Sequence, residues 1–294
     1  MTAATPGSPP ARVMWHLLEP YHAVAYFADE VRESLASAGM RGFWMGYFAG
    51  RAAPMGAVAT GVVTATFYGF APAMVSRAIP DAWGFAAPDR VWAAKVDGVR
   101  AALSRLLGDA DVGVEEAARL AREAAGACQP HGRPLFAAYA DLPWPDDPHL
   151  VLWQAATLVR EHRGDGHVAA LVAGGIDGCE AHALMVAAGR IRREALQPHR
   201  GWTDEEWDGA LARLRARGWL DAVGAVTAAG REARAGVEAL TDRLAAAPWD
   251  HLGAESTARL AALLAPLVER IDAAGVIPYP NPMGLPGRAT GERG

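Results

Sequence analysis

Residues 203–230, TDEEWDGALARLRARGWLDAVGAVTAAG, decide the fold of the second half of the chain. Thr203 and Glu206 form a capping-box pair, in which each side chain can accept a hydrogen bond from the other residue's backbone N–H. Apolar residues then recur at helical spacing as far as Gly218, which is suited to end a helix. We therefore expect a helix over residues 207–217.

Two short runs of β-forming residues follow, at 219–221 and 225–227, and they predict a small hairpin. Thr227 can cap a further helix over 228–246. Upstream, the apolar pattern predicts helices over 150–163, 167–173 and 179–188, and Gly164-Asp165-Gly166 is expected to break the chain between the first two. Helix, turn, helix, hairpin and helix is the order of a winged helix-turn-helix domain.

The first half of the chain is also helical in pattern, so the expected fold class is all-α. Pro20 lies inside the first helical pattern and predicts a kink or a new start there. Asp111 is a candidate cap for the helix over 113–127. The predicted helices cover 15–35, 43–51, an apolar stretch from 54 to 76, 89–107, 113–127, a short turn at 135–139, and 256–274.

The length of 294 residues favours two domains. Proline clusters between residues 129 and 148, which is typical of a connection between domains. The predicted division is a disordered tail (1–11), a helical domain (12–128), a Pro-rich linker (129–148), a winged-helix-like domain (149–248), a closing helix (249–277) and a Pro/Gly-rich tail (278–294).

The stretch from Ala52 to Ser76 carries no charge and is long enough to span a bilayer. Its glycines, threonines and Pro72 favour a buried core helix instead, so we expect no membrane partner. The first ten residues lack the pattern of a signal peptide. We therefore expect a cytoplasmic protein whose two cysteines, Cys128 and Cys179, are reduced.

Several short motifs carry a resemblance to known families. The run around the predicted third helix and hairpin resembles MarR-type regulators, and the chain as a whole resembles a largely uncharacterised actinobacterial helix-turn-helix (SalK-like) family. The resemblance implies a winged-helix fold and no particular activity. The motifs are EPYH (19–22), RAAPMG (51–56), FYGFAP (67–72), HRGDGH (162–167), TD (241–242) and PW (248–249).

The predicted recognition helix is acidic at the end that would face DNA. Its first residues include four carboxylates, whereas helices that contact base edges and phosphates carry Arg, Lys, Asn or Gln there. The net charge is -5, and the wing tip at 222–224 has no basic residue. DNA is therefore an unlikely partner. The four carboxylates are Asp204, Glu205, Glu206 and Asp208.

The HRGDGH run supports several kinds of chemistry. His162, Asp165 and His167 could perform acid–base catalysis or, with a metal or haem, act as ligands. Arg163 could instead bind an anion beside exposed backbone N–H groups. A purely structural role, with Asp165 as a helix cap and Arg163 in an ion pair, is equally compatible with the pattern.

A second group of polar residues accompanies the uncharged stretch of the first half. Helices that present a few polar groups on an apolar background can wall a ligand cavity. Tight helix packing explains the same pattern. The candidate ligand-binding residues are His22, Tyr26, Arg51, Thr64, Tyr68 and Arg163.

These observations favour a small-molecule-binding protein with a degenerate winged-helix domain and an apolar ligand. Two alternatives stay open: an enzyme of specialised metabolism that uses His162, Asp165 and His167, with or without haem or metal, and a ligand-responsive MarR-like regulator. The sequence identifies no cofactor, and a homodimer is compatible with it.

Overall fold

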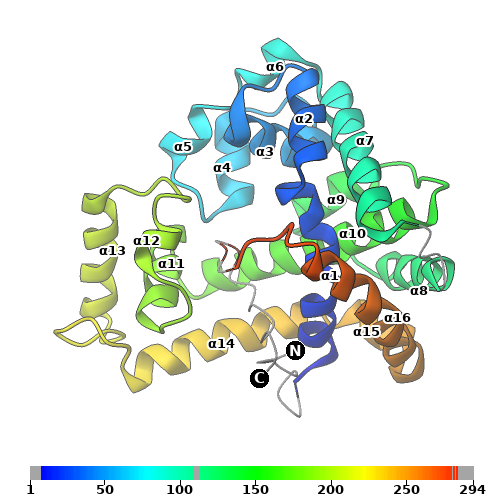
Figure 1. The fold of residues 1–294 in the computed structure, drawn as a ribbon. Helices are drawn as coiled ribbons and strands as arrows, with labels where there is room; N and C mark the ends of the chain where they lie inside the picture. The colour runs from blue at the N-terminus through cyan, green and yellow to red at the C-terminus, as the bar shows by residue number, and fades with distance from the viewer. Residues whose placement is uncertain (1–7, 109–112, 280, 282, 284–294) are drawn as a thin grey trace, which may run out of the picture.

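The computed structural model describes residues 8–108, 113–279, 281 and 283. In this part of the chain the secondary structure is helical, with no β-strand, which confirms the all-α class (Figure 1). The helices of the first half are α1 (Pro10–Phe27), α2 (Asp29–Ser37), α3 (Gly42–Ala52), the 3₁₀-helix η1 (Ala53–Met55), α4 (Thr60–Phe67), α5 (Pro72–Ser76), α6 (Ala82–Phe85), α7 (Pro88–Leu107), α8 (Val114–Gly126) and α9 (Pro134–Ala140).

The second half continues the helical architecture. Figure 1 shows α10 passing through the middle of the molecule, α14 below it, and α8, α15 and α16 together at one side. The helices are α10 (Pro148–Ala173), α11 (Gly178–Ala187), α12 (Arg193–Leu196), α13 (Asp204–Ala216), α14 (Ala228–Leu244), α15 (Ala247–Leu252) and α16 (Ala254–Ala273).

The larger hydrophobic core surrounds the first half of α10. Leu152 and Trp153 of that helix are almost fully buried against residues of α1, α7, α8 and α16, and the cluster extends from Ala11 to Ile277. Burial of large apolar side chains of this kind is the main favourable contribution to folding. The boundaries between the predicted domains stay a prediction.

A smaller core holds α11, α12 and α13 together. Trp207 and Leu214 of α13 are fully buried against Cys179, Leu184 and neighbouring residues. The capping box of Thr203 and Glu206 is present, as the sequence predicts. A second capping box, formed by Asp177 and Glu180, begins α11 and is not among the features predicted from the sequence. The two helices that flank α12, α11 and α13, therefore each begin with a capping box.

The predicted β-hairpin is not observed. Within the described residues its two runs meet only in a single antiparallel bridge, between Leu220 and Val226. The Asp221 side chain accepts hydrogen bonds from the backbone N–H groups of Val223 and Ala225, at 3.0 and 2.8 Å. Among the described backbone groups, the two runs share only the hydrogen bonds from Asp221 to Ala225 and from Thr227 to Trp219, so the pairing is too short to form strands, and the carboxylate stabilises the turn between them.

The predicted break at Gly164-Asp165-Gly166 is wrong, because α10 continues through it without interruption. The glycines make room for packing instead. A Cβ atom on Gly166 would lie 2.9 Å from Nη1 of Arg133 and 3.2 Å from Cβ of Leu244. Arg133 uses this space to donate hydrogen bonds to the carbonyl oxygens of His162 and Leu244, which joins α10 to α14.

The apolar stretch from 54 to 76 does not form one helix. It is divided into η1, α4 and α5. Gly56 and Tyr68 have φ values of 80° and 47°, which interrupt the helical backbone, and Pro72 starts the last piece. The helix predicted over 15–35 is likewise divided, at Ala28, although it passes Pro20 without ending. Asp111, the predicted cap, lies outside the described residues.

Among the described helices, none is by itself long and apolar enough to cross a membrane. One bent pair, α10 with α11 at 93°, meets the criteria of length and composition when the two are joined. Much of α10 is buried inside the protein core. Cys128 and Cys179 are both buried and form no disulfide.

Candidate functional site

A cavity of about 1530 Å³ lies where the two cores face each other. Its wall is built from α1, α3, α10, α11 and α14, and from the segments around Tyr68 and Arg200. Six of the nine residues predicted as catalytic or ligand-binding line it: Tyr26, Arg51, Tyr68, Arg163, Asp165 and His167. The other three, His22, Thr64 and His162, lie behind the wall.

One end of the cavity is aromatic. Trp44 and Tyr47 of α3 contact each other at a ring separation of 5.7 Å, and both lie within 6.0 Å of Phe70. Tyr26 of α1 lies 5.2 Å from Tyr47. Edge and tilted contacts of this kind hold aromatic rings in defined positions. This end is therefore a preformed surface for a flat or apolar group.

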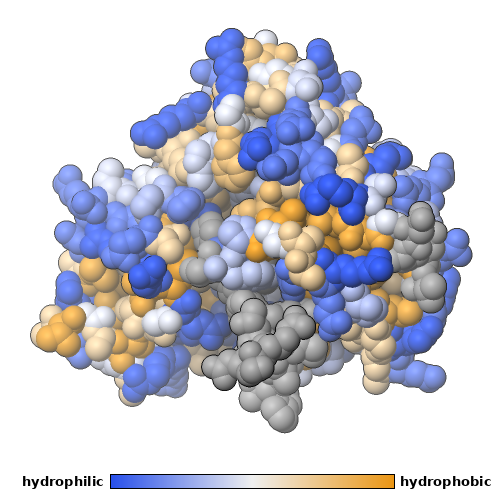
Figure 2. Space-filling view, viewed as in Figure 1, coloured by the Kyte–Doolittle hydropathy of each residue, from blue (hydrophilic) through white to orange (hydrophobic). Residues whose placement is uncertain are grey.

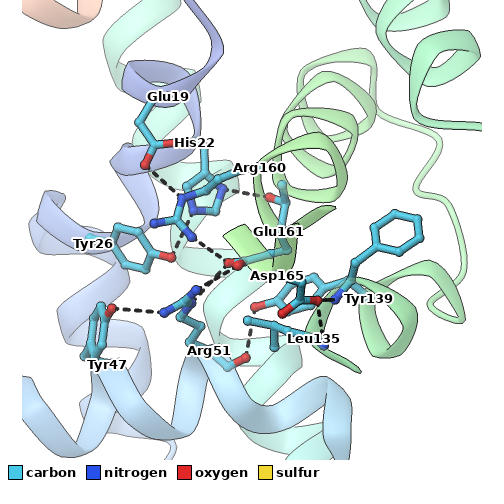
Figure 3. Close-up of polar contacts among 12 residues, drawn as sticks. Glu19, His22, Tyr26, Tyr47, Arg51, Leu135, Tyr139, Arg160, Glu161 and Asp165 are labelled. Atoms are coloured by element: carbon cyan, nitrogen blue, oxygen red, sulfur yellow. Dashed lines mark hydrogen bonds and ion pairs between the residues drawn. The ribbon is translucent and has the colours of Figure 1, made fainter. Parts of the chain in front are cut away.

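A buried ion network forms the floor next to the aromatic end (Figure 3). Arg51 of α3 donates to both carboxylate oxygens of Glu161, at 3.1 and 2.7 Å. Arg160 donates to Glu161 at 2.7 Å and to Glu19 of α1 at 2.8 Å. Two arginines thus face two carboxylates, so the network is neutral overall and joins α1, α3 and α10.

The network determines the protonation of Glu161. Burial alone would raise the pKa of this carboxyl group, but the adjacent Arg51 and Arg160 lower its pKa to about 2. Glu161 therefore stays charged and bound to the two arginines throughout the physiological pH range.

His22 supports the wall and does not reach the cavity. It is fully buried, with Nδ1 2.9 Å from Oγ1 of Thr157 and Nε2 3.0 Å from the hydroxyl of Tyr26. Burial, followed by the nearby arginines and Lys95, lowers the pKa of His22. His22 therefore does not line the cavity but positions Tyr26, and its role as a ligand contact stays a prediction. Thr64 is also absent from the wall, and its buried Oγ1 has no partner among the described residues.

The opposite end of the cavity is cationic. Four arginines and two histidines gather there from four different segments, and two carboxylates of α14 accompany them. Arg12 is 2.6 Å from Asp242 and 3.4 Å from Glu238. The cationic end, as the term is used below, comprises Arg12, His16, Arg163, His167, Arg190, Arg234, Glu238 and Asp242.

The positive charge at the cationic end is only partly balanced. Arg163 is 7% exposed, and its Nη2 contacts Asp242 at 2.9 Å. Nη1 of Arg163 is buried without a hydrogen-bond partner in the described part of the chain. Arg190 and Arg234 form no ion pair with any described residue. Four guanidinium groups therefore share two carboxylates, which leaves an excess of two positive charges.

The surrounding groups respond to this excess charge. Burial lowers the pKa of His16, and the charges of Arg163, Arg12 and Arg190 lower it further. Burial also lowers the pKa of Arg234; Glu238 acts in the opposite direction, while Arg190 and Arg12 lower the pKa further. An anion at this end would relieve the repulsion and stabilise all of these charged groups.

The predicted catalytic group does not assemble. Asp165 accepts hydrogen bonds from the backbone N–H groups of Leu135 and Phe136, at 3.1 and 2.9 Å, and so caps α9. His162 packs edge-on against Phe136 behind the wall, and its buried Nδ1 has no partner among the described residues. Nδ1 of His167 is 2.9 Å from Oγ1 of Thr241.

The protonation states agree with structural roles for these groups. Burial lowers the pKa of His162 to about 3, with Arg133 acting in the same direction. Burial raises the pKa of Asp165 to about 6, against the effect of its backbone hydrogen bonds. Within the described residues, no cluster of three or more His, Cys, Asp or Glu residues is arranged to hold a metal ion.

Sequence reasoning identified half of this site. It found Tyr26 of the aromatic end, Arg51 of the ion network and Tyr68 of the wall, but it missed the cationic end except for Arg163 and His167. The available signal was on α14, where Arg231, Arg234, Glu238 and Asp242 recur at three- and four-residue spacing and so share one face.

The helices α11, α12 and α13 form a lobe beside the cavity, in which two longer helices are joined by a short connection. The helix α13 packs against α11 through Trp207 and Leu214, and α12 lies in the connection between them. The sequence profile of a helix-turn-helix family matches residues 11–278.

The chain belongs to this helix-turn-helix family. No curated protein and no solved structure matches the chain significantly. The narrower MarR-type and SalK-like resemblances stay predictions.

The helix α13 of this lobe carries exposed carboxylates. The side chains of Asp204 and Asp208 on α13 are 88% and 69% exposed. Arg213 contacts Asp177 and Glu180 at 2.6 and 3.0 Å, so its charge is compensated within the protein. Figure 2 shows hydrophilic side chains over α13 and a hydrophobic tip on the loop that follows it, where Val223 is 88% exposed.

Proposed function

We propose that this helix-turn-helix protein binds a small organic anion in the cavity between its two cores. The apolar or aromatic body of the ligand lies against the aromatic end, and its anionic group lies at the cationic end. The observation that carries the proposal is the excess of two positive charges in a partly buried cavity whose other wall is aromatic.

The size and lining of the cavity support this proposal. Its volume of about 1530 Å³ exceeds that of typical ligand pockets, which are on the order of 300–1,000 Å³. Such pockets combine apolar walls with a few polar groups that fix orientation. The sequence predicts an apolar ligand, and the cationic end adds an anionic group to that prediction.

The energetics favour an anion more than a neutral ligand. A hydrogen bond between charged groups contributes about 1.5–3 kcal/mol. Arg190 and Arg234 form no ion pair with a described residue, so their contacts with an anion would replace no internal ones. Arg163 offers its buried Nη1 in addition. Loss of one such contact would therefore weaken anion binding about 10- to 100-fold, and loss of both arginines would weaken it at least tenfold.

Membership of the helix-turn-helix family favours a second candidate, a ligand-responsive regulator that contacts DNA. The exposed carboxylates of α13 and the apolar loop tip at Val223 oppose phosphate contacts. We therefore propose ligand binding as the primary function, with weak intrinsic affinity for DNA.

Two related dyes test the proposed ligand chemistry. 8-Anilinonaphthalene-1-sulfonate carries an anion on an aromatic body, and N-phenyl-1-naphthylamine has the same body without the anion. Fluorescence titration of the full chain is expected to show one-to-one binding of the sulfonate with at least tenfold higher affinity. The variant R190Q/R234Q is expected to lower sulfonate affinity at least tenfold and to leave the affinity for the neutral dye within twofold.

The matched control is R100Q, because Arg100 is exposed on α7 and far in sequence from the cavity wall. This variant is expected to bind both dyes as the wild type does. Equal affinity for the two dyes in the wild type, or equal losses in R100Q and R190Q/R234Q, would contradict the proposal.

A further inference from the structure

The chain contains a single lysine, and it is buried. Lys95 of α7 is 2% exposed. Its Nζ donates to the carbonyl oxygen of Gly50 at 3.2 Å and to the hydroxyl of Tyr139 at 3.4 Å. Among the described residues, no carboxylate lies within ion-pair distance of it. A buried lysine without a carboxylate partner is uncommon, because the charged form loses its hydration.

Four aromatic rings surround the amine. Nζ lies 5.6–5.8 Å from the ring centres of Tyr26, Trp92, Tyr139 and Trp153. These rings come from α1, α7, α9 and α10, so they enclose Nζ from several directions. Ring faces at this distance attract a cation.

Burial nevertheless favours the neutral amine. It lowers the pKa of Lys95 to about 7; Glu161 acts in the opposite direction, while Arg51 and Arg160 lower the pKa further. The other titratable groups that face the amine or its cavity are Tyr26, Tyr47, Tyr139, Arg32 and Glu33. A lysine with an ordinary pKa of 10.5 is almost wholly protonated at pH 7, whereas a substantial fraction of Lys95 is an unprotonated nucleophile.

Lys95 also lines a second cavity. This cavity has a volume of about 260 Å³ and lies between α2 and α3, against Leu35, Met40 and Phe43. Gly46 and Gly50 of α3 also line this cavity, and a Cβ atom on either would have only ordinary contacts, the nearest at 3.5 Å. An apolar cavity of about 150 Å³ can hold benzene, so this one accommodates a ligand of that size or larger.

We propose that Lys95 is a covalent attachment site for a small apolar aldehyde, with which its Nζ condenses to an imine. The amine nitrogen attacks the carbonyl carbon, a C=N bond replaces the C=O bond, and the carbonyl oxygen leaves as water with the two amine hydrogens. Tyr139, whose hydroxyl accepts a hydrogen bond from Nζ at 3.4 Å, is placed to take up an amine proton as it gives its own to the departing oxygen, so that the hydroxyl is unchanged after the step.

The surroundings favour this product over other lysine adducts. A protonated imine keeps a positive charge, which the four rings can stabilise as they do the ammonium group. A carbamate would place an anion between ring faces, which repel negative charge. The site is separate from the cationic end, so the proposal does not rest on the proposed function.

The test uses benzaldehyde with sodium cyanoborohydride, which reduces the imine to a stable secondary amine. The full chain carries the substitution R100K, so that an exposed lysine on the same helix competes with Lys95. Peptide mapping by mass spectrometry separates the two sites and the N-terminus. At pH 7, Lys95 is expected to be modified at least tenfold faster than the introduced lysine, and its rate should level off above about pH 7.

A second variant tests the cavity. Gly46→Leu in the R100K background fills the space next to Leu35, where a Cβ atom has only an ordinary contact at 3.5 Å. This change is expected to slow modification of Lys95 at least tenfold and to leave the introduced lysine unaffected. The proposal is overturned if Lys95 reacts no faster than the introduced lysine, or if filling the cavity slows neither site.

Discussion

Arg51 and Glu161 form a buried, two-pronged ion pair that joins α3 to the middle of α10, with N–O distances of 3.1 and 2.7 Å. The side chains are 11% and 1% exposed, so water compensates little of either charge. Arg160 shares the same carboxylate and continues the connection to Glu19 of α1. The pair therefore fixes three helices around the cavity floor.

Substitution of Glu161 should be strongly destabilising. Glu161→Gln keeps the shape of the side chain and removes its charge, which leaves Arg51 and Arg160 buried with one carboxylate between them. Loss of one partner of a buried ion pair costs about 3–5 kcal/mol. Urea unfolding is expected to show a loss of that size.

The control is Glu123→Gln, because Glu123 forms a pair with Arg119 in which both side chains are largely exposed. It should change the unfolding free energy by less than about 0.5 kcal/mol, and similar losses in the two variants would contradict this account.

Two glycines in helices should respond to alanine in opposite directions. A Cβ atom on Gly98 of α7 would lie 2.5 Å from Cα of Val31, so α2 and α7 must separate. Gly98→Ala is expected to lower the unfolding free energy by about 1–3 kcal/mol. No atom lies within 4 Å of the corresponding position on Gly236 of α14. Gly236→Ala is expected to raise the unfolding free energy by about 0.5–1 kcal/mol, because alanine favours helix more than glycine. Thermal unfolding followed by circular dichroism measures both, and a stable Gly98→Ala variant would refute the close packing of α2 on α7.

The raised pKa of Asp165 predicts a specific pH dependence. Its pKa is about 6 in the folded protein and 3.8 in the unfolded chain, so the folded state binds more protons between these values. Its contribution to stability is therefore present below about pH 3.8 and is lost as the pH rises through 6.

The variant Asp165→Asn tests this dependence, because its side chain can still accept hydrogen bonds from Leu135 and Phe136 but does not titrate. The stability of this variant relative to the wild type should rise by up to about 3 kcal/mol between pH 4 and pH 8. Denaturant unfolding at several pH values measures the difference, and a constant difference would show that Asp165 does not titrate in this way.

The charge of α13 predicts weak binding to DNA. In a gel-shift experiment at physiological salt, the wild type is expected to give no shift at micromolar concentration with DNA from upstream of its own gene. A variant with Asp204→Asn and Asp208→Asn removes two of the four exposed carboxylates of α13 and should bind DNA more tightly than the wild type. A salt-dependent shift by the wild type at nanomolar concentration would instead support the regulator.

Local signals in the sequence predicted the helix-turn-helix lobe well. The capping box of Thr203 and Glu206 acts within one turn of helix, so its signal is contained in four residues. The HRGDGH run shows the opposite case. Its glycines resemble helix breakers, but Gly166 is needed because Arg133 and Leu244 approach α10 closely. That requirement comes from tertiary packing, which no local pattern records.

The residues of the candidate site show the same contrast between local sequence signals and tertiary packing. Tyr26 is identifiable because it lies four residues from His22 on one helical face, and Arg51 because it directly precedes the uncharged stretch that begins at Ala52. The cationic end is assembled from Arg12, Arg190 and Arg234, which belong to three distant segments and resemble ordinary surface arginines in the sequence. Tertiary packing brings them together, because α14 lies below α10 (Figure 1) and contacts both α10 and α1.

A crystal structure of the protein with bound 8-anilinonaphthalene-1-sulfonate tests the central claim most directly. The account predicts the dye inside the cavity, with its rings on the side of the aromatic end and its sulfonate within about 4 Å of Arg190 or Arg234. A dye bound outside the cavity, or one whose sulfonate points away from these arginines, would contradict the account.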